Sequence, residues 1–509
     1  MRSTNVGWLK PASCLGMISA ASMLCLAQHP QVQAINPSPL MDSAGNVRQD
    51  AFIGMSVPAV DRAYEKIDGR RIKEKDLEVV GISLKSRDAG DKYWGRIAGT
   101  KYERMTAEWA EAKWRQYGLT DIHQQEYDLP LQWFALDWNV TATGNGKTLS
   151  FKSINPSVGS VPTPPGGLEA EAVWVGTGSA ADFLGRDVRG KAVLILSILE
   201  PGNMGESAGW EGAWKRAADA GAAAIFTIWG YNDNLAVWQG MTAGRGNQIR
   251  VPGFFMGWED GKALRDLIAT GEPVKIKMNL KTETRSGLKA VAAYGTLPGT
   301  TDETLYVLAH TDGYYEASLD NASGLAVMDT LAEYFSQIPK AQRRRNIVFV
   351  ASSGHHAGSP TTQYMHDHRD TMLAKTALIL NCEHISHADL LQWTTHLRVS
   401  NTIQERRWFV NGSGRLTEIA LKAFHEFGVN LVAEMDPTAT GDMGHIQRDA
   451  PAIQVIDSPE IKHTDADKPE LVPDAGLAAV ARAYAKIIDE VNKLDRKDLQ
   501  PGSPLSAAR

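Results

Sequence analysis

Two short motifs near residue 310 contain the side chains best suited to bind a metal ion. The first is HTDG (310–313), at the end of an apolar run, and the second is LDNASG (319–324). Side chains on a strand repeat every two residues, so His310 and Asp312 point the same way and the Asp312 carboxylate can orient the imidazole. Asp320 follows His310 by ten residues, at the start of a predicted helix, and can converge on the same ion. Zinc accepts this mixture of a nitrogen and an oxygen donor.

Continuous apolar strands alternate with helices around these motifs. We predict strands at 305–309, 346–351 and 377–381, and helices at 321–336, 359–373, 413–427 and 475–494. Strands that are apolar on both faces and alternate with helices indicate a buried, mixed and mostly parallel sheet flanked by helices, which is an α/β fold. Two earlier helices, predicted at 58–69 and 106–118, would cover the same sheet.

The middle of the chain has a different texture, with short strands separated by glycine-rich and proline-rich turns. Three blocks in it resemble a protease-associated (PA) domain: DVRGKAVLI (187–195), KRAADAGAAAIF (215–226) and VPGFF (251–255). A PA domain does no chemistry itself but narrows the cleft of the enzyme that carries it. We therefore predict these domains: a PA-like insert at 138–283, a catalytic domain made of 58–137 and 284–495, and a C-terminal tail at 496–509.

The motifs near residue 310 open a longer series that resembles the zinc aminopeptidase and glutamate carboxypeptidase family of metallopeptidases. The family order is HxD, DNxSG, a Glu-Glu pair, a carboxylate after an Asn-x pair, and a late YHT-type histidine. This chain keeps that order over roughly residues 58–495, in these segments: HTD (310–312), DNASG (320–324), GHHAG (354–358), NCE (381–383) and IKHTDAD (461–467). The resemblance implies a zinc exopeptidase-like fold into which a PA domain is inserted.

The resemblance also implies a set of metal ligands. One ion would be held by His310, Asp320 and Glu383, and the other by Asp320, His356 and His463, so that Asp320 bridges the two positions. Both positions keep nitrogen and oxygen donors and an open place for water, as zinc favours. We expect one or two zinc ions, or another divalent metal. The resemblance further implies a cis peptide bond after Asp320.

The chain departs from the family at the Glu-Glu pair, which is replaced by His355-His356. By position, His355 takes the place of the general base that accepts a proton from water. We interpret His384, which follows Glu383, as a partner of a ligand. Two further residues of the GDMGH loop, Asp442 and His445, are candidates for the substrate side of the site.

These observations predict a metal-dependent hydrolase that cleaves a terminal peptide bond or a related amide. Two alternatives remain open: an enzyme of this fold with another reaction, such as a lyase or cyclase, and an inactive binding homologue. The expected partner is a peptide or small amide substrate. A net charge of −6 without a basic stripe argues against nucleic acid as a partner.

The N-terminus predicts export. Arg2 and Lys10 precede the apolar run CLGMISAASMLCLA (14–27), and VQA (32–34) places small residues at −3 and −1 of a cut after Ala34. This is the layout of a secretory signal peptide, and the apolar run is too short for a spanning helix. We predict a signal peptide at 1–34 and a secreted or periplasmic protein without a stable membrane anchor.

Overall fold

The computed structural model describes residues 47–199, 206–241, 249–392, 397–457, 459 and 461–502. The predicted signal peptide lies outside the described residues, so export stays a prediction. The chain divides into a unit of residues 1–48 and a unit of residues 49–509, and every element below belongs to the second unit. Within the described residues, no helix has both the length and the apolar character that a membrane crossing requires.

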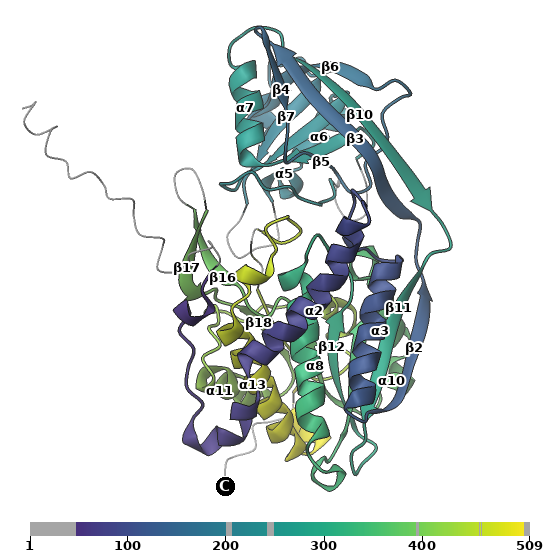
Figure 1. The fold of residues 1–509 in the computed structure, drawn as a ribbon, viewed down its shortest axis with the longest axis vertical. Helices are drawn as coiled ribbons and strands as arrows, with labels where there is room; N and C mark the ends of the chain where they lie inside the picture. Colours follow the sequence, from purple (N-terminus) through teal and green to yellow (C-terminus); the bar gives the residue numbers. More distant parts are fainter. Residues whose placement is uncertain are drawn as a thin grey trace, which may run out of the picture. The chain divides into compact units, whose positions relative to one another are not determined.

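A seven-stranded mixed sheet organises one part of this unit (Figure 1). Its strands, in spatial order, are β18 (Arg407–Asn411), β19 (Ala452–Ile456), β15 (Thr376–Cys382), β12 (Thr304–His310), β14 (Asn346–Ser352), β11 (Lys289–Leu297) and β2 (Thr120–Asp128). The four strands from β19 to β14 are parallel, and the outer pairings are antiparallel. The predicted mixed α/β sheet is confirmed, with the three predicted apolar strands at its centre.

Successive side chains of the central strands point to opposite faces of the sheet, and each face is covered by an apolar layer. In β12, Leu305 and Val307 pack into the layer with α2, α3, α8, α11 and α13, whereas Tyr306 and Leu308 face the layer with α9, α10 and α12. This period of two explains why the strands are apolar throughout, since both faces are covered. The helices are α2 (Gly69–Asp88), α3 (Lys101–Gln116), α8 (Ser323–Ser336), α9 (Pro360–Asp367), α10 (Arg369–Met372), α11 (Gly414–Glu426), α12 (Met443–Ile446) and α13 (Asp474–Asn492).

The first predicted helices differ from the structure in their bounds. Residues predicted as a helix at 58–69 form the short 3₁₀ helix η2 (Ala59–Lys66), and the long helix α2 begins only at Gly69. The cause is Asp68, whose carboxylate accepts hydrogen bonds from the backbone N–H of Arg70 and Arg71 and so caps a new helix. Likewise α3 begins at Lys101, ahead of the predicted 106, because the Thr100 hydroxyl caps it.

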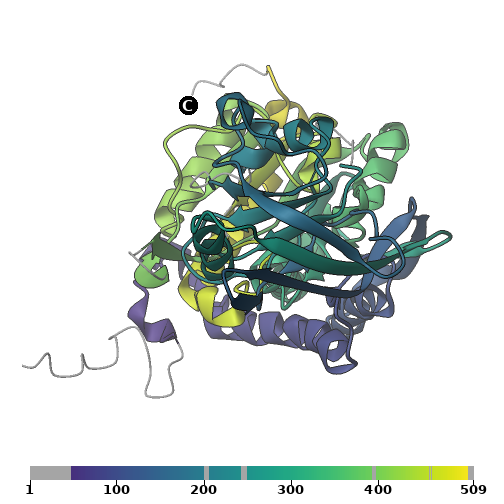
Figure 2. The ribbon, with the colours of Figure 1, turned by 90° about the horizontal axis from the view of Figure 1, so that it is seen from above.

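Residues 132–285 contribute an eight-stranded sheet of their own. Its spatial order is β4 (Lys147–Ser150), β3 (Gln132–Gly144), β10 (Lys275–Arg285), β6 (Leu168–Trp174), β7 (Ala192–Ser197), β8 (Ala224–Trp229), β9 (Gly253–Met256) and β5 (Asn155–Pro156). Strands β6 to β9 are parallel. One face packs on α5 (Ser207–Trp210) and α6 (Ala213–Asp219), and the other on α7 (Trp258–Ile268). Seen from above, the blue and teal strands of this sheet cross the view (Figure 2).

Two long strands join the sheets. The chain leaves the seven-stranded sheet after β2, enters the eight-stranded sheet through β3, and returns through β10 to β11 (Figure 1). β3 and β10 are antiparallel partners along their length, with a bulge at Lys281/Thr282. The predicted PA identity and the boundaries at 138 and 283 stay predictions. Within the predicted tail, Leu499 is fully buried, so residues 496–499 are part of the fold.

Candidate metal centre

Side chains with metal-binding atoms follow the ends of neighbouring parallel strands in the seven-stranded sheet. β12 ends at His310 itself, β14 is followed by His355-His356, and β15 is followed by Glu383 and His384. His463 lies in the loop after β19. The carboxyl ends of parallel strands meet at one edge of a sheet, so these segments come together there.

Asp320 lies at the centre of this group, in the turn η3 (Ser318–Ala322) before α8. Four imidazole Nε2 atoms surround its carboxylate. His310 and His384 each place Nε2 3.1 Å from Oδ1, while His356 and His463 place theirs 3.3 and 3.0 Å from Oδ2. Donors of one zinc ion, bound at about 2.0–2.2 Å, lie roughly 3–4 Å apart. The spacing therefore suits an ion on each side of Asp320.

The other ring nitrogen of each imidazole has an oxygen acceptor. His310 Nδ1 donates to the Asp312 carbonyl at 3.0 Å, and His384 Nδ1 donates to the Asp457 carbonyl at 2.8 Å. His356 Nδ1 donates to Asp312 Oδ2 at 2.9 Å. An acceptor at Nδ1 holds the proton there and leaves the Nε2 lone pair free for a metal. The fourth imidazole, His463, follows the same pattern with an amide oxygen described below.

The carboxylate of Asp312 forms hydrogen bonds with the His355-His356 turn, and it lies farther from the ring of His310. It lies 3.6 Å from His310 Nδ1, and it accepts hydrogen bonds from the backbone N–H groups of His355 and His356, each at 2.9 Å. The predicted orienting role for His310 is taken by the Asp312 backbone carbonyl. Glu103 holds the same turn from α3, because its Oε1 accepts from the Gly354 N–H at 2.7 Å.

Four atoms of the cluster are buried without a hydrogen-bond partner: His310 Nε2, Asp320 Oδ1, Glu383 Oε1 and His384 Nε2. Buried polar atoms without partners are rare and costly. Imidazole nitrogens and carboxylate oxygens in this proportion fit zinc. A bound cation would therefore give these four atoms the partner that they lack. The five ligands implied by the family resemblance all lie in this one cluster, and the implied cis bond, Asp320–Asn321, is present.

The electrostatics of the cluster also favour added positive charge. Burial lowers the pKa of His310, but the side chains of Asp312 and Asp320 outweigh it and raise that pKa to about 10. Burial raises the pKa of Asp320, but the imidazoles of His384 and His356 hold it well below its usual range. A metal competes with protons for such atoms, so the site attracts cations of either kind.

His355 is aimed at the cluster by a second carboxylate. Its Nδ1 donates to Asp442 Oδ1 at 2.9 Å, and the Ser352 hydroxyl donates to the other Asp442 oxygen. His355 Nε2 then lies 3.9 Å from Glu383 Oε1, and the ring stacks on that of His310 with centroids 4.1 Å apart. Asp442 thus reaches the site, whereas His445, one turn further along α12, has an exposed side chain.

The loop between β8 and β9 supplies a contact to the cluster that sequence reasoning missed. Gln239 Oε1, in the loop after β8, accepts a hydrogen bond from His463 Nδ1 at 3.3 Å. Beside it, the Trp238 N–H donates to the His463 carbonyl at 2.9 Å, and Val237 pairs with Thr464 as an antiparallel bridge. No motif marks residues 236–239, because their partner is far away in the sequence.

Arg96, which sequence reasoning gave no role in the site, holds the loop between the two original motifs. Its side chain is fully buried, and it donates to the carbonyls of Thr311 at 2.9 Å and Ala317 at 3.1 Å. From the other end, Asp467 accepts hydrogen bonds from the backbone N–H groups of Leu319 and Asp320. The turn that carries Asp320 is therefore held from both sides.

A cavity of about 380 Å³ opens beside the cluster. Its lining includes His356 and Asp312 of the cluster and the aromatic residues Tyr93, Trp133 and Tyr314. Its size suits a small organic group, and its lining combines aromatic rings with polar groups in about equal measure.

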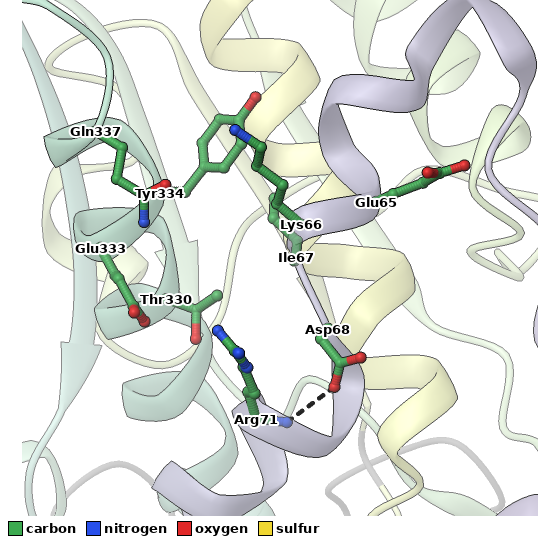
Figure 3. A pocket seen from close by; sticks show the side chains of 9 residues that line it. All are labelled: Glu65, Lys66, Ile67, Asp68, Arg71, Thr330, Glu333, Tyr334 and Gln337. Carbon is green, nitrogen blue, oxygen red and sulfur yellow. Dashed lines mark hydrogen bonds between the residues drawn. The ribbon is translucent and has the colours of Figure 1, made fainter.

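Another cavity, of about 390 Å³, lies between the start of α2 and the far half of α8 (Figure 3). Its charged groups, among them Glu65, Lys66, Arg71 and Glu333, carry no metal-binding pattern, and Asp68 is occupied in capping α2. It is a polar surface hollow rather than a reaction site.

Comparisons with known proteins agree with this geometry. Residues 293–488, which contain all of the metal ligands implied above, match the model of peptidase family M28. The chain is similar in structure to a zinc aminopeptidase from Bacillus subtilis, at 19% identity and a TM-score of 0.61, over 88% of this chain and 100% of that one. It is also similar to a peptidase M28 precursor from Shewanella amazonensis SB2B, at 16% identity and a TM-score of 0.67, over 87% and 100%.

A third similar structure is an aminopeptidase from Aneurinibacillus sp. strain AM-1, at 17% identity and a TM-score of 0.57, over 88% of this chain and 98% of that one. No curated protein matches the chain. At these identities the structural likeness establishes the fold, and the family match confirms the metallopeptidase resemblance read from the motifs.

Proposed function

We propose that the chain is an exported zinc aminopeptidase that removes the N-terminal residue of a peptide, because residues 293–488 match the model of peptidase family M28. The observation that carries the proposal is the convergence of four imidazole Nε2 atoms on the buried carboxylate of Asp320. The names of the similar solved structures support the aminopeptidase direction.

The residues that would hold the metal are His310, Asp320 and Glu383 on one side and Asp320, His356 and His463 on the other. Zinc held by such donors polarises a carbonyl and lowers the pKa of water, which is the chemistry that peptide hydrolysis needs. Glu383 is prepared to bind a metal, because its Oε2 accepts hydrogen bonds from Asn381 and the Asp442 N–H, which leaves Oε1 free.

His355 is the group we assign as the general base. Its Nδ1–H is engaged with Asp442, so Nε2 is the nitrogen left to accept a proton, and this nitrogen faces the metal-binding cluster. Asp442 acts through His355 as a positioning residue, as a carboxylate does when it fixes the tautomer and direction of a catalytic imidazole. A histidine can accept a proton from water at neutral pH, so the exchange of Glu for His preserves base catalysis.

The aromatic cavity next to His356 supports a preference for apolar side chains. A substrate whose carbonyl lies at the cluster can place one side chain against the aromatic rings that line this cavity, those of Tyr93, Trp133 and Tyr314. Export rests on the sequence of residues 1–34, and the capping role of a PA-like insert rests on the three sequence blocks quoted above.

The alternatives differ in what they require of the cluster. A binding homologue has no need of orphaned donors and a positioned imidazole, so this reading is the weakest of the three. Another metal-dependent reaction, such as cyclisation or elimination, remains compatible with the changed base.

The experiment is an assay of the purified, zinc-loaded protein on Leu-p-nitroanilide and Phe-p-nitroanilide, with N-acetyl-Leu-p-nitroanilide as the matched blocked substrate. We expect release of p-nitroaniline from the free-amine substrates, loss of activity after chelation, and recovery on adding zinc. Cleavage of the blocked substrate would reject the aminopeptidase assignment, and bound zinc without any cleavage would favour a different reaction.

A further inference from the structure

The two oxygen atoms of Asp320 have unequal surroundings. On the Oδ1 side the ring nitrogens of His310 and His384 and an oxygen of Glu383 lie within 4.8 Å of one another. On the Oδ2 side, within the part of the chain that the structure describes, the cluster consists of His356 and His463. Counting Asp320 itself, one side has four donors and the other has three.

The Oδ1 side is also the more enclosed of the two. All four of its donor atoms are buried and lack a hydrogen-bond partner, and all four are lone-pair acceptors that face one another. These lone pairs can face one another only with a cation between them, either a proton or a metal ion. On the Oδ2 side the rings of His356 and His463 are 10% and 13% exposed, and a molecule from outside can reach them.

His384 is held so that it points at this group. Its Nδ1 donates to the Asp457 carbonyl at 2.8 Å, which leaves Nε2 as the free acceptor, 3.1 Å from Asp320 Oδ1. Its backbone has φ +47°, in the left-handed region that few non-glycine residues adopt. Such conformations persist where the surrounding structure fixes them, and they cluster at functional sites.

We propose that His384 is a metal ligand, so that the two zinc positions have different roles. The position at Oδ1 is enclosed by His310, Asp320, Glu383 and His384, and the position at Oδ2 is bounded by Asp320, His356 and His463 alone. Zinc with four protein donors has the closed character of a structural site, whereas three protein donors leave a place for water or substrate. The Oδ2 position is then the one left open to water or substrate. This inference rests on the metal centre of the proposed function but not on its substrate.

The test is a zinc titration of the chelator-stripped protein against a competing zinc-binding dye. For the wild type we expect two zinc ions with well-separated affinities, the tighter one at Oδ1. The informative variant is His384→Asn. Asparagine can keep a donor at the place of Nδ1 for the Asp457 carbonyl, and it tolerates a positive φ, but it has no atom at the place of Nε2.

In His384→Asn we expect the tighter affinity to fall by more than about a hundredfold, beyond the roughly 10–100-fold cost of losing an outer partner of a ligand. The weaker affinity should stay within a few-fold of wild type. The absorption spectrum of the Co²⁺-loaded protein gives an independent readout, since its d–d bands follow the ligand set. The matched control is His366→Asn, which removes an imidazole bound to Asp449, and it should keep both affinities.

The outcomes separate this inference from the proposed function. If His384→Asn binds two zinc ions as tightly as the wild type, His384 is only a structural partner and the inference is wrong, while the peptidase proposal stands. A wild-type protein that binds no zinc at all overturns both. Thermal unfolding of the apo-proteins, in which His384→Asn should match the wild type within a few degrees, shows that any loss of zinc is not a loss of fold.

Discussion

The seven-stranded and the eight-stranded sheet contain the same arrangement at their centres, four neighbouring parallel strands with helices on both faces. In the first sheet the strands run into His310, His355-His356 and Glu383-His384. In the second, β8 and β9 end at Trp229 and Met256, and each is followed directly by a glycine. The chemistry therefore depends on the last residue of a strand and on the first four residues after it.

The buried carboxylates near the two sheets also differ in their surroundings. Asp320 in the first part is surrounded by imidazoles, which keep its pKa low despite burial. Glu206, which precedes α5 in the second part, has a serine hydroxyl and an amide as hydrogen-bonding neighbours, and burial raises its pKa to about 8. Asp320 therefore keeps its negative charge and can bind a cation, whereas Glu206 is held in its neutral form. Function therefore follows from the loop residues rather than from the strand arrangement.

The largest effect should come from Asp320→Asn. This change removes the carboxylate that both zinc positions share, so we expect loss of at least one equivalent of zinc. We expect kcat/KM on Leu-p-nitroanilide to fall by roughly 10³–10⁵-fold, since metal polarisation supplies several kcal/mol. The control in the other part is Asp219→Asn, an exposed carboxylate on α6 paired with Lys215, which should leave both quantities unchanged. Equal zinc content in Asp320→Asn and wild type would contradict the site.

The second test separates proton transfer from metal binding. His355→Ala should lower kcat by about 10²–10⁴-fold, the usual contribution of a general base, with zinc content unchanged. His355→Glu should restore part of this loss, because a carboxylate can accept the same proton. Asp442→Asn should give a smaller decrease, since it leaves the imidazole in place but without its partner. Wild-type turnover in both His355 variants would show that His355 is not the base.

The third test uses the buried carboxylate of the eight-stranded part. The folded state holds the proton of Glu206 up to about pH 8, although the Lys462 ammonium opposes this, whereas the unfolded state releases it near the ordinary value of 4.5. The stability from this group is thus complete below about pH 4.5 and is lost as pH rises through 8. At roughly 1.4 kcal/mol per pH unit, the loss is on the order of 4–5 kcal/mol by pH 9.

The isosteric variant Glu206→Gln has no such proton to lose, so its free energy of unfolding should fall less between pH 5.5 and pH 9. Urea unfolding at three pH values measures the difference directly. Parallel curves for the two proteins would mean that Glu206 is ionised in the folded state as freely as in the unfolded one.

The smallest effect should come from Gln239→Ala, which tests whether the eight-stranded part supports the metal centre. The amide oxygen is the acceptor for His463 Nδ1, so its loss should weaken the zinc at the Oδ2 position by about 10–100-fold. Gln363→Ala, which removes a surface amide bonded to Asp367, is the control. If the two variants bind zinc equally well, the second sheet has no part in the centre.

The sequence indicates the ligand set more clearly than it indicates how the ligands are held. HTD and DNASG lie within one strand-turn-helix segment, so the proximity of His310 and Asp320 follows from local structure. The approach of His384 to Asp320 depends on a left-handed φ at residue 384, which no spacing rule predicts. Gln239 lies in the loop between β8 and β9, 224 residues from its partner His463. Long-range contacts of this kind arise from packing and leave no periodic trace in the sequence.

Element bounds show the same limit at a smaller scale. The helix predicted at 58–69 ends near a glycine that the structure uses as the first residue of α2, because the Asp68 cap decides where the helix begins. The candidate loop residues also separate: Asp442 points to His355, whereas His445 is exposed. Pattern alone places both on one loop and cannot tell which side chain turns inward.

The pairing of residues 236–238 with residues 463–465 bears on how such a chain can be rearranged in evolution or by design. An insert joined by two strands at one point is commonly treated as a cassette that can be excised or exchanged. Here the loop that carries His463 is completed by backbone groups of Ala236 and Trp238. A chimera that swaps residues 132–285 must therefore bring along a matching 461–467 loop, and the two segments should be inherited together.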